Sequence, residues 1–121
     1  MAVAEVDYLN GGGGGSEYGS LNVTAGETVT VPLNFTPKEI LLVQTNPTSQ
    51  TYTSWTYLYD EDYSTTKMRF CGGNTSYGSW NDFNFSDVGN GTSGFIEVSN
   101  GFKFVNGSRD GFRRIDYIAI R

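Results

Sequence analysis

The sequence contains no histidine and a single cysteine, Cys71. The first absence excludes a histidine-based catalytic triad and a histidine metal site. The second excludes a disulfide framework or a cysteine-rich zinc site within one chain. Basic residues are also scarce, since eight Lys and Arg stand against thirteen Asp and Glu, for a net charge of −5. Because neutralising phosphates requires clustered cations, we expect no nucleic-acid partner.

Long apolar runs and targeting signals are also missing from the sequence. The longest strongly apolar run covers residues 40–43, whereas a membrane-spanning helix needs about 20 apolar residues. The first six residues are too few and too polar for a secretory signal, and they include Glu5. We therefore expect no membrane insertion, and we expect synthesis in a reducing cytoplasm, where a lone cysteine stays free.

Aromatic, β-branched and turn-forming residues dominate the composition. Two Trp, eight Tyr and eight Phe occur among the 121 residues, together with 16 Gly. Aromatic and β-branched side chains suit a pleated, half-buried surface, and Gly, Asn and Ser supply turns. The usual helix formers are scarce, and no window shows apolar residues at helical spacing. The composition predicts one all-β domain, because a chain of this length matches a single core.

Short apolar runs bounded by turn residues predict eight or nine strands. Side chains alternate within residues 27–33, and Pro32 places this strand at a sheet edge or ends it there. The continuous run 40–44 is expected to be buried on both faces. The predicted strands cover residues 3–8 (a strand or an extended arm), 27–33, 40–44, 51–59, 65–71, 79–85, 95–99, 102–105 and 115–120. This rhythm predicts a single antiparallel β-sandwich, such as a jelly roll.

The pair Asn100-Gly101 lies between two alternating runs and is the strongest hairpin signal in the sequence. Both residues of such a turn adopt positive φ, which Asn and Gly tolerate best. A two-residue turn at this point predicts a register in which Glu97 lies opposite Phe104.

Five consecutive glycines, residues 11–15, mark the N-terminal region. Ordering such a run costs backbone entropy unless something holds it in place. We therefore interpret residues 1–19 as an N-terminal arm with a glycine-rich hinge, and residues 20–121 as the β-sandwich domain. The arm is expected either to dock onto a partner protein or to be a leader without fixed structure.

Charge is distributed unevenly along the chain. Residues 1–66 hold eight acids and one base, whereas residues 67–121 hold five acids and seven bases. Two interpretations are open. Either the imbalance has no consequence in a small domain, or the acidic side of one subunit meets the basic side of the next. The second interpretation predicts a homo-oligomer.

Aromatic side chains supply the candidate ligand-binding residues. Alternation along residues 51–59 places Trp55, Tyr57 and Tyr59 on one strand face, and Trp80 is expected nearby. Exposed rings of this kind stack on sugar rings, and the abundance of Tyr, Asn, Ser and Gly is typical of adaptable binding surfaces. The alternative is that the rings form one layer of the core, because large aromatic side chains dominate core burial.

Carboxylates supply the other chemical candidates. Residues 60–62 form an acidic turn in which Asp60 and Asp62 are candidate calcium ligands, although the spacing matches no complete calcium-loop motif. A glycoside hydrolase needs two carboxylates at a set separation across a cleft, and nothing in the sequence places them so. Cys71 has no histidine to activate it. We therefore expect no cofactor and no enzymatic activity, with a hydrolase as the opposing hypothesis.

Three segments carry a resemblance to a known group of proteins. They are residues 35–43 (FTPKEILLV), 100–104 (NGFKF) and 116–121 (DYIAIR). In this order they resemble segments of the small β-sandwich domains of tailed-bacteriophage virion structural proteins, such as fibre tips and decoration proteins. The resemblance extends over about residues 33–121. The segments are also similar to H-type lectin domains, whose last strand carries an aromatic-x-Ala-Ile-like ending.

The resemblance implies a non-enzymatic homo-oligomer, often a trimer, exposed on a virion surface after synthesis in the host cytoplasm. Such a domain decorates the head or caps a tail or fibre, and it mediates assembly or host adhesion. Its partners would be copies of itself, other virion proteins reached through residues 1–19, and a host surface glycan. The alternative function is a carbohydrate-binding, lectin-like module that uses Trp55, Tyr57, Tyr59 and Trp80.

Overall fold

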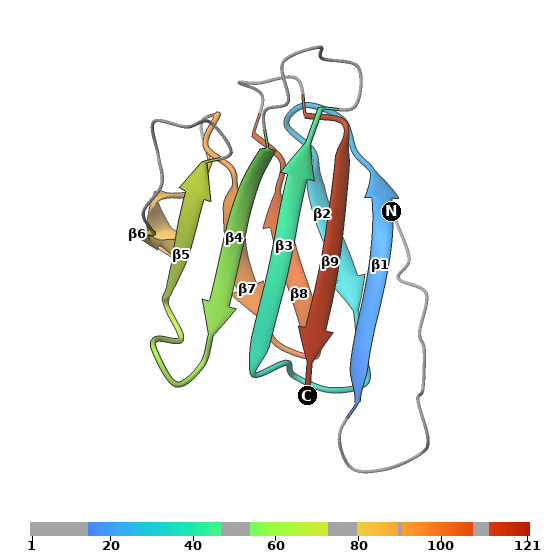
Figure 1. Ribbon diagram of the computed structural model, residues 1–121, viewed down its shortest axis with the longest axis vertical. Coiled ribbons are helices and arrows are strands. Elements are labelled where there is room, and N and C mark those ends of the chain that lie inside the picture. Colours follow the sequence, from blue (N-terminus) through green and yellow to red (C-terminus); the bar gives the residue numbers. More distant parts are fainter. Residues whose placement is uncertain (1–14, 47–53, 73–79, 90, 108–111) are drawn as a thin grey trace.

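The computed structural model describes residues 15–46, 54–72, 80–89, 91–107 and 112–121 (Figure 1). These ranges contain nine strands, one 3₁₀-helix, η1 (Phe85–Asp87), and no α-helix. The strands are β1 (Ser16–Asn22), β2 (Thr28–Pro32), β3 (Glu39–Thr45), β4 (Ser54–Asp60), β5 (Lys67–Gly72), β6 (Asn81–Asn84), β7 (Gly94–Val98), β8 (Gly101–Val105) and β9 (Arg114–Ile120). The prediction of an all-β chain is confirmed.

The strands form two antiparallel sheets that pack face to face (Figure 1). The larger sheet has six strands in the order β1-β9-β3-β4-β5-β6, and the smaller has three in the order β2-β8-β7. Strand β2 is thus an edge strand and ends at Pro32, as the missing backbone donor of that residue predicts. The predicted antiparallel β-sandwich is confirmed.

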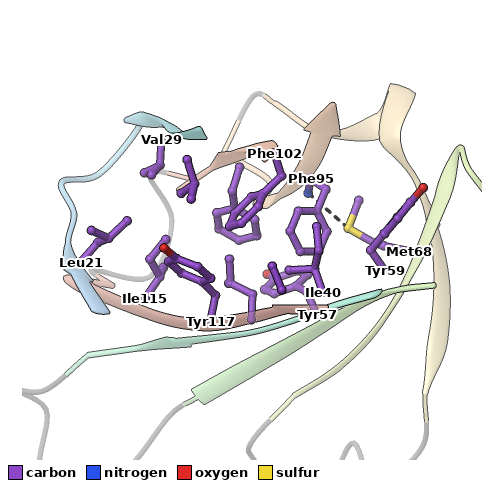
Figure 2. Packing of buried hydrophobic residues seen from close by; sticks show 14 of the residues in the cluster. Leu21, Val29, Ile40, Tyr57, Tyr59, Met68, Phe95, Phe102, Ile115 and Tyr117 are labelled. Atoms are coloured by element: carbon purple, nitrogen blue, oxygen red, sulfur yellow. Dashed lines mark hydrogen bonds between the residues drawn. The ribbon is translucent and has the colours of Figure 1, made fainter. Parts of the chain in front are cut away.

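The core lies between the two sheets and is rich in aromatic rings (Figure 2). Phe95, Phe102 and Phe104 project from the smaller sheet, and the Phe95 ring lies 5.6 Å from Phe102 and 5.4 Å from Phe104, near-perpendicular to both. Tyr57 of the larger sheet meets Phe104 edge-on at 5.1 Å. Edge-to-face pairs of this kind are worth about 0.5–1.5 kcal/mol beyond the burial of their area. Aromatic packing therefore joins the two sheets.

Strand β3 differs from its predicted burial. Ile40, Leu42 and Gln44 are buried, but Leu41 is 40% exposed and Val43 is half-buried. The prediction that this run is buried on both faces was therefore wrong. The physical reason is that only one face of the larger sheet is covered by the smaller sheet, as is common for antiparallel sheets.

The turn between β7 and β8 has the predicted conformation, with φ of 50° at Asn100 and 116° at Gly101. Its register was predicted wrongly. Phe95 rather than Glu97 pairs with Phe104, and a β-bulge lies between Phe95 and Glu97. Two effects produce the difference. Val98 pairs with Phe102 rather than with Lys103, so the connection is one residue longer than predicted, and the bulge adds a further residue beyond Glu97. Glu97 instead lies opposite Lys103 and forms an ion pair of 3.2 Å with it.

Strand β1 begins at Ser16, inside the segment that the sequence analysis assigns to the hinge. Residues 16–19 pair with residues 117–120 of β9, so they belong to the larger sheet. Gly19 permits this pairing because a Cβ at that position would lie 2.7 Å from the hydroxyl oxygen of Tyr117. The expected strand at 3–8 and glycines 11–14 lie outside the described residues.

Candidate functional site

An aromatic pocket opens between strands β4, β5 and β6 and the segment that leads into β7. It has a volume of about 210 Å³. Trp55 and Tyr57 of β4, Phe70 of β5 and Phe83 of β6 form its aromatic wall, and residues 91–93 line the opposite side. We call this set of residues the aromatic pocket.

The rings of the aromatic pocket are arranged around Phe70. Trp55 stacks on Phe70 at 5.5 Å with 25° between the ring planes, and Tyr57 lies at 6.4 Å with 28°. Phe83 meets Phe70 edge-on, at 5.8 Å and 80°. The adjacency of β4, β5 and β6 in the sheet produces this cluster, because it aligns inward-facing side chains of successive strands. The wall therefore offers ring faces at a fixed angle to one another.

A buried hydrogen-bond network backs the aromatic pocket. The side-chain amide of Gln44 donates to Ser93 Oγ (2.8 Å) and to Asn106 Oδ1 (2.6 Å). The Tyr57 hydroxyl donates to Gln44 Oε1 (3.2 Å), and the backbone N–H of Gly107 donates to Ser93 Oγ (2.8 Å). Gln44 and Asn106 are fully buried. Buried polar groups that are all satisfied hold their neighbours in one arrangement, so the network fixes Tyr57 and Ser93.

The structure separates the four predicted ligand-binding aromatics. Trp55 and Tyr57 line the aromatic pocket. Tyr59 is buried in the core, where its ring lies 6.4 Å from that of Phe95. Trp80 directly precedes β6, is 47% exposed and is not among the residues that line the pocket.

Sequence reasoning missed the remaining pocket residues, which are Phe70, Phe83 and residues 91–93. Phe70 and Phe83 lie in strands that were predicted. The order of these strands along the sequence, directly after the strand of Trp55 and Tyr57, could have indicated that their side chains are neighbours. Successive antiparallel strands are usually neighbours. Ser93 lies outside any strand, and no local pattern marks it.

Asp60, one of the two candidate calcium ligands, is engaged in local interactions at the turn after β4. Asp60 Oδ1 accepts the backbone N–H of Asp62 at 3.0 Å, and Asp60 also forms an ion pair of 3.5 Å with Arg69. Within the ranges that the structure describes, no three His, Cys, Asp or Glu side chains gather in a way that could hold a metal ion.

The outer face of the larger sheet carries a row of apolar side chains on neighbouring strands. The register aligns Tyr18 of β1, Ile118 of β9, Leu41 of β3 and Leu58 of β4. Tyr18 is 51% exposed and Leu41 is 40% exposed, and the other two are half-buried. We call these four residues the outer apolar row. Contiguous exposed apolar surface of this kind is typical of an interaction site.

Glu17 and Tyr117 form a buried polar pair beside edge strand β1. Glu17 is 1% exposed, and neither of its carboxylate oxygens has a hydrogen-bond partner among the described residues. The same holds for the Tyr117 hydroxyl. Burial raises the pKa of Glu17, an effect that the positive charge of Arg121 reduces. Burial and the charge of Glu17 together raise the pKa of Tyr117 to about 12.

Replacing Glu17 with glutamine is expected to stabilise the protein increasingly as the pH rises. The raised pKa means that the folded state binds this proton more tightly than the unfolded state does. The wild-type free energy of unfolding therefore falls as the pH rises above the ordinary glutamate value and through the raised one. Glu17→Gln removes that fall, because an uncharged amide costs less to bury than a carboxylate.

Urea unfolding of wild type and Glu17→Gln at mildly acidic and neutral pH checks this expectation. Glu61→Gln, in an exposed turn, is the control. An advantage of Glu17→Gln that is equal at both pH values would show that the Glu17 carboxylate is not the responsible group.

Comparison of the chain with protein-family models, with curated proteins and with solved structures finds no match. Within the described ranges, no helix has the length and apolar character needed to cross a membrane.

Proposed function

We propose that this chain is a non-enzymatic structural protein of a virion surface, which assembles with copies of itself through the outer apolar row. The row carries the proposal, because it aligns four large apolar side chains on the face of the larger sheet that the smaller sheet leaves uncovered. Burying this surface between subunits would be favourable at about 25 cal/mol per Å² of apolar area.

Two ion pairs lie on the same face as the outer apolar row. Arg69 is paired with Asp60 at 3.5 Å, and Arg114 is paired with Asp116 at 3.1 Å. These four charges are neutralised within the chain, and Glu39 and Lys67 are further exposed charges on this face. In the expected trimer the interfaces are heterologous, so the outer apolar row of one copy meets a different patch of the next copy.

Support for the virion setting comes from the resemblance of residues 35–43, 100–104 and 116–121 to small sandwich domains of tailed-phage structural proteins. Decoration of a head and capping of a tail or fibre both require a compact domain that packs against neighbours and faces solvent elsewhere. The expected oligomer is a trimer, and the part of residues 1–19 that precedes β1 is the expected contact with other virion proteins.

Replacing Leu41 with glutamate is expected to convert the oligomer to a monomer. The substitution would bury a charge in the subunit interface, and burying unpaired charge costs several kcal/mol, so association should weaken by about 100-fold or more. Light scattering at two protein concentrations, with wild type alongside, gives the mass directly.

Ile96→Glu is the matched control, because Ile96 is 37% exposed, close to the 40% of Leu41, and lies on the smaller sheet. This variant should remain oligomeric. A wild-type protein that is monomeric at both concentrations would contradict the proposed function. Equal dissociation of both variants would contradict the assignment to the outer apolar row.

A further inference from the structure

We propose that the aromatic pocket binds one neutral pyranose ring of a glycan. This inference is independent of self-association, because the pocket faces the interior side of the larger sheet and the outer apolar row lies on the opposite face. Tyr57, which lines the pocket, and Leu58, in the row, are adjacent in β4 and therefore point to opposite faces.

The size of the pocket suits a single ring. Its volume of about 210 Å³ is below the range of roughly 300–1,000 Å³ that is typical of sites for larger ligands. Trp55 and Phe70 stand nearly parallel, and Phe83 is nearly perpendicular to Phe70. Aromatic faces carry partial negative charge, so they attract the polarised C–H groups on the flat side of a pyranose.

The polar end of the pocket favours a ligand with oxygen atoms. Ser93 Oγ already accepts two N–H donors, from Gln44 and Gly107. A serine hydroxyl has two acceptor sites and one proton. No described residue is recorded as accepting that proton, so it is available to a ligand hydroxyl or ring oxygen. A purely apolar occupant would leave this donor unpaired and would lose affinity for that reason.

The absence of charge among the described lining residues favours a neutral ligand. Of the residues that the structure describes, those that line the pocket carry no formal charge. A phosphate, a sulfate or an acidic sugar would have to give up its water without gaining a counter-ion, which is costly. The network around Gln44 is complete before any ligand arrives, so the site is preorganised and binding needs little rearrangement of the protein.

Tryptophan fluorescence of the Trp80→Phe variant tests the proposal, because Trp55 is then the sole tryptophan in the chain. The probes are methyl glucopyranoside, methyl galactopyranoside, methyl mannopyranoside and N-acetylglucosamine. At least one should change the Trp55 emission saturably, with a dissociation constant of about 1 mM, as one small ring allows. The control variant Trp55→Phe, which keeps only Trp80, should show no saturable change.

Phe83→Ala in the Trp80→Phe background tests the wall of the pocket. Phe83 is on edge strand β6 and only half-buried, so its removal should leave the fold intact, which circular dichroism checks. The affinity for the bound pyranoside should fall about tenfold, which corresponds to about 1.4 kcal/mol. An unchanged affinity would overturn the assignment of the ligand to this pocket.

Two further probes separate the proposal from its competitors. N-acetylprolinamide stands for a partner peptide, and methyl glucuronide stands for an acidic sugar. Saturation by N-acetylprolinamide without saturation by any neutral pyranoside would make the pocket a peptide-docking site and overturn the proposal. Equal binding of the glucuronide would overturn the preference for neutral rings. No response to any pyranoside up to about 100 mM would overturn it entirely.

Discussion

Gly101→Ala is expected to lower the free energy of unfolding by about 3–5 kcal/mol, a large part of the stability of a small domain. Two effects add at this position. Gly101 has φ of +116°, which L side chains rarely adopt. A Cβ there would also overlap the carbonyl oxygen of Val31 and lie 2.8 Å from the backbone nitrogen of Leu33. Neither neighbour is a flexible side chain, so the backbone of β2 or β8 would have to shift.

Gly89→Ala separates the two effects. Gly89 has φ of +119°, nearly the same as Gly101, but an added Cβ would meet nothing within 4 Å. Only the backbone strain applies, so this substitution should cost about 1–3 kcal/mol. Urea unfolding of both variants, followed by circular dichroism, gives the difference. Equal losses would show that the close approach of β2 to Gly101 is not important for stability.

Asn106→Ala is expected to cost about 3–5 kcal/mol, because it removes the centre of the buried network. The Asn106 side chain accepts from Gln44 and donates to the carbonyl oxygens of Thr24 (2.8 Å) and Phe112 (3.2 Å). All three partners would lose a hydrogen bond in places that are buried or partly buried. The backbone bonds of residue 106 to Glu27 and Gly26 remain available to alanine.

Asn22→Ala is the matched control for this substitution, since Asn22 lies exposed at the end of β1. Its effect should stay within about 0.5 kcal/mol, as is usual for surface positions. Thermal and urea unfolding of the two variants measure the contrast. A loss of less than about 1 kcal/mol for Asn106→Ala would mean that the freed groups find other partners and that the network does little to hold the two sheets together.

The strand pattern of this fold was predictable because alternation is a local property. Val29 and Val31 of β2 are buried as their spacing predicts, and so are Tyr57 and Tyr59 of β4. The turn chemistry of residues 100–101 was equally readable, because both positions need positive φ. These signals depend on neighbouring residues alone, and no knowledge of the other strands is needed to read them.

The errors arose where the structure depends on distant residues. Strand β1 has few apolar side chains, and one of its inward residues is Glu17. Its sequence therefore lacks the alternating apolar pattern that would predict a strand, and its pairing with β9 could not be predicted. The longer connection between Val98 and Phe102 and the bulge at Ile96 have no sequence signature either, yet together they pair Phe104 with Phe95 instead of Glu97. The continuous apolar run in β3 looked buried on both sides, whereas its exposed residue Leu41 belongs to the outer apolar row.

In the candidate site, too, some residues could be predicted from the local sequence and others depend on distant residues. Alternation placed Trp55 and Tyr57 on one face, and both line the aromatic pocket. Phe83 joins them only because β6 lies beside β5 at the end of the sheet, which no single-strand pattern can show. Ser93 acquires its orientation from Gln44, which is 49 residues away in the sequence. The polar half of the pocket is therefore a product of the assembled sandwich.

The position of β9 has a consequence for how the chain folds. Strand β9 is the last in the sequence, yet it lies inside the larger sheet between β1 and β3, and it pairs Ile120 with Ser16. This pairing closes a loop of nearly the whole domain, and the entropy of that closure must be lost before the strand contacts compensate for it. Folding is therefore expected on the millisecond-to-second timescale of high-contact-order sandwiches. Until β9 inserts, β3 presents an unpaired edge and β1 has no partner in the sheet, so a partly folded chain is open to pairing with its neighbours.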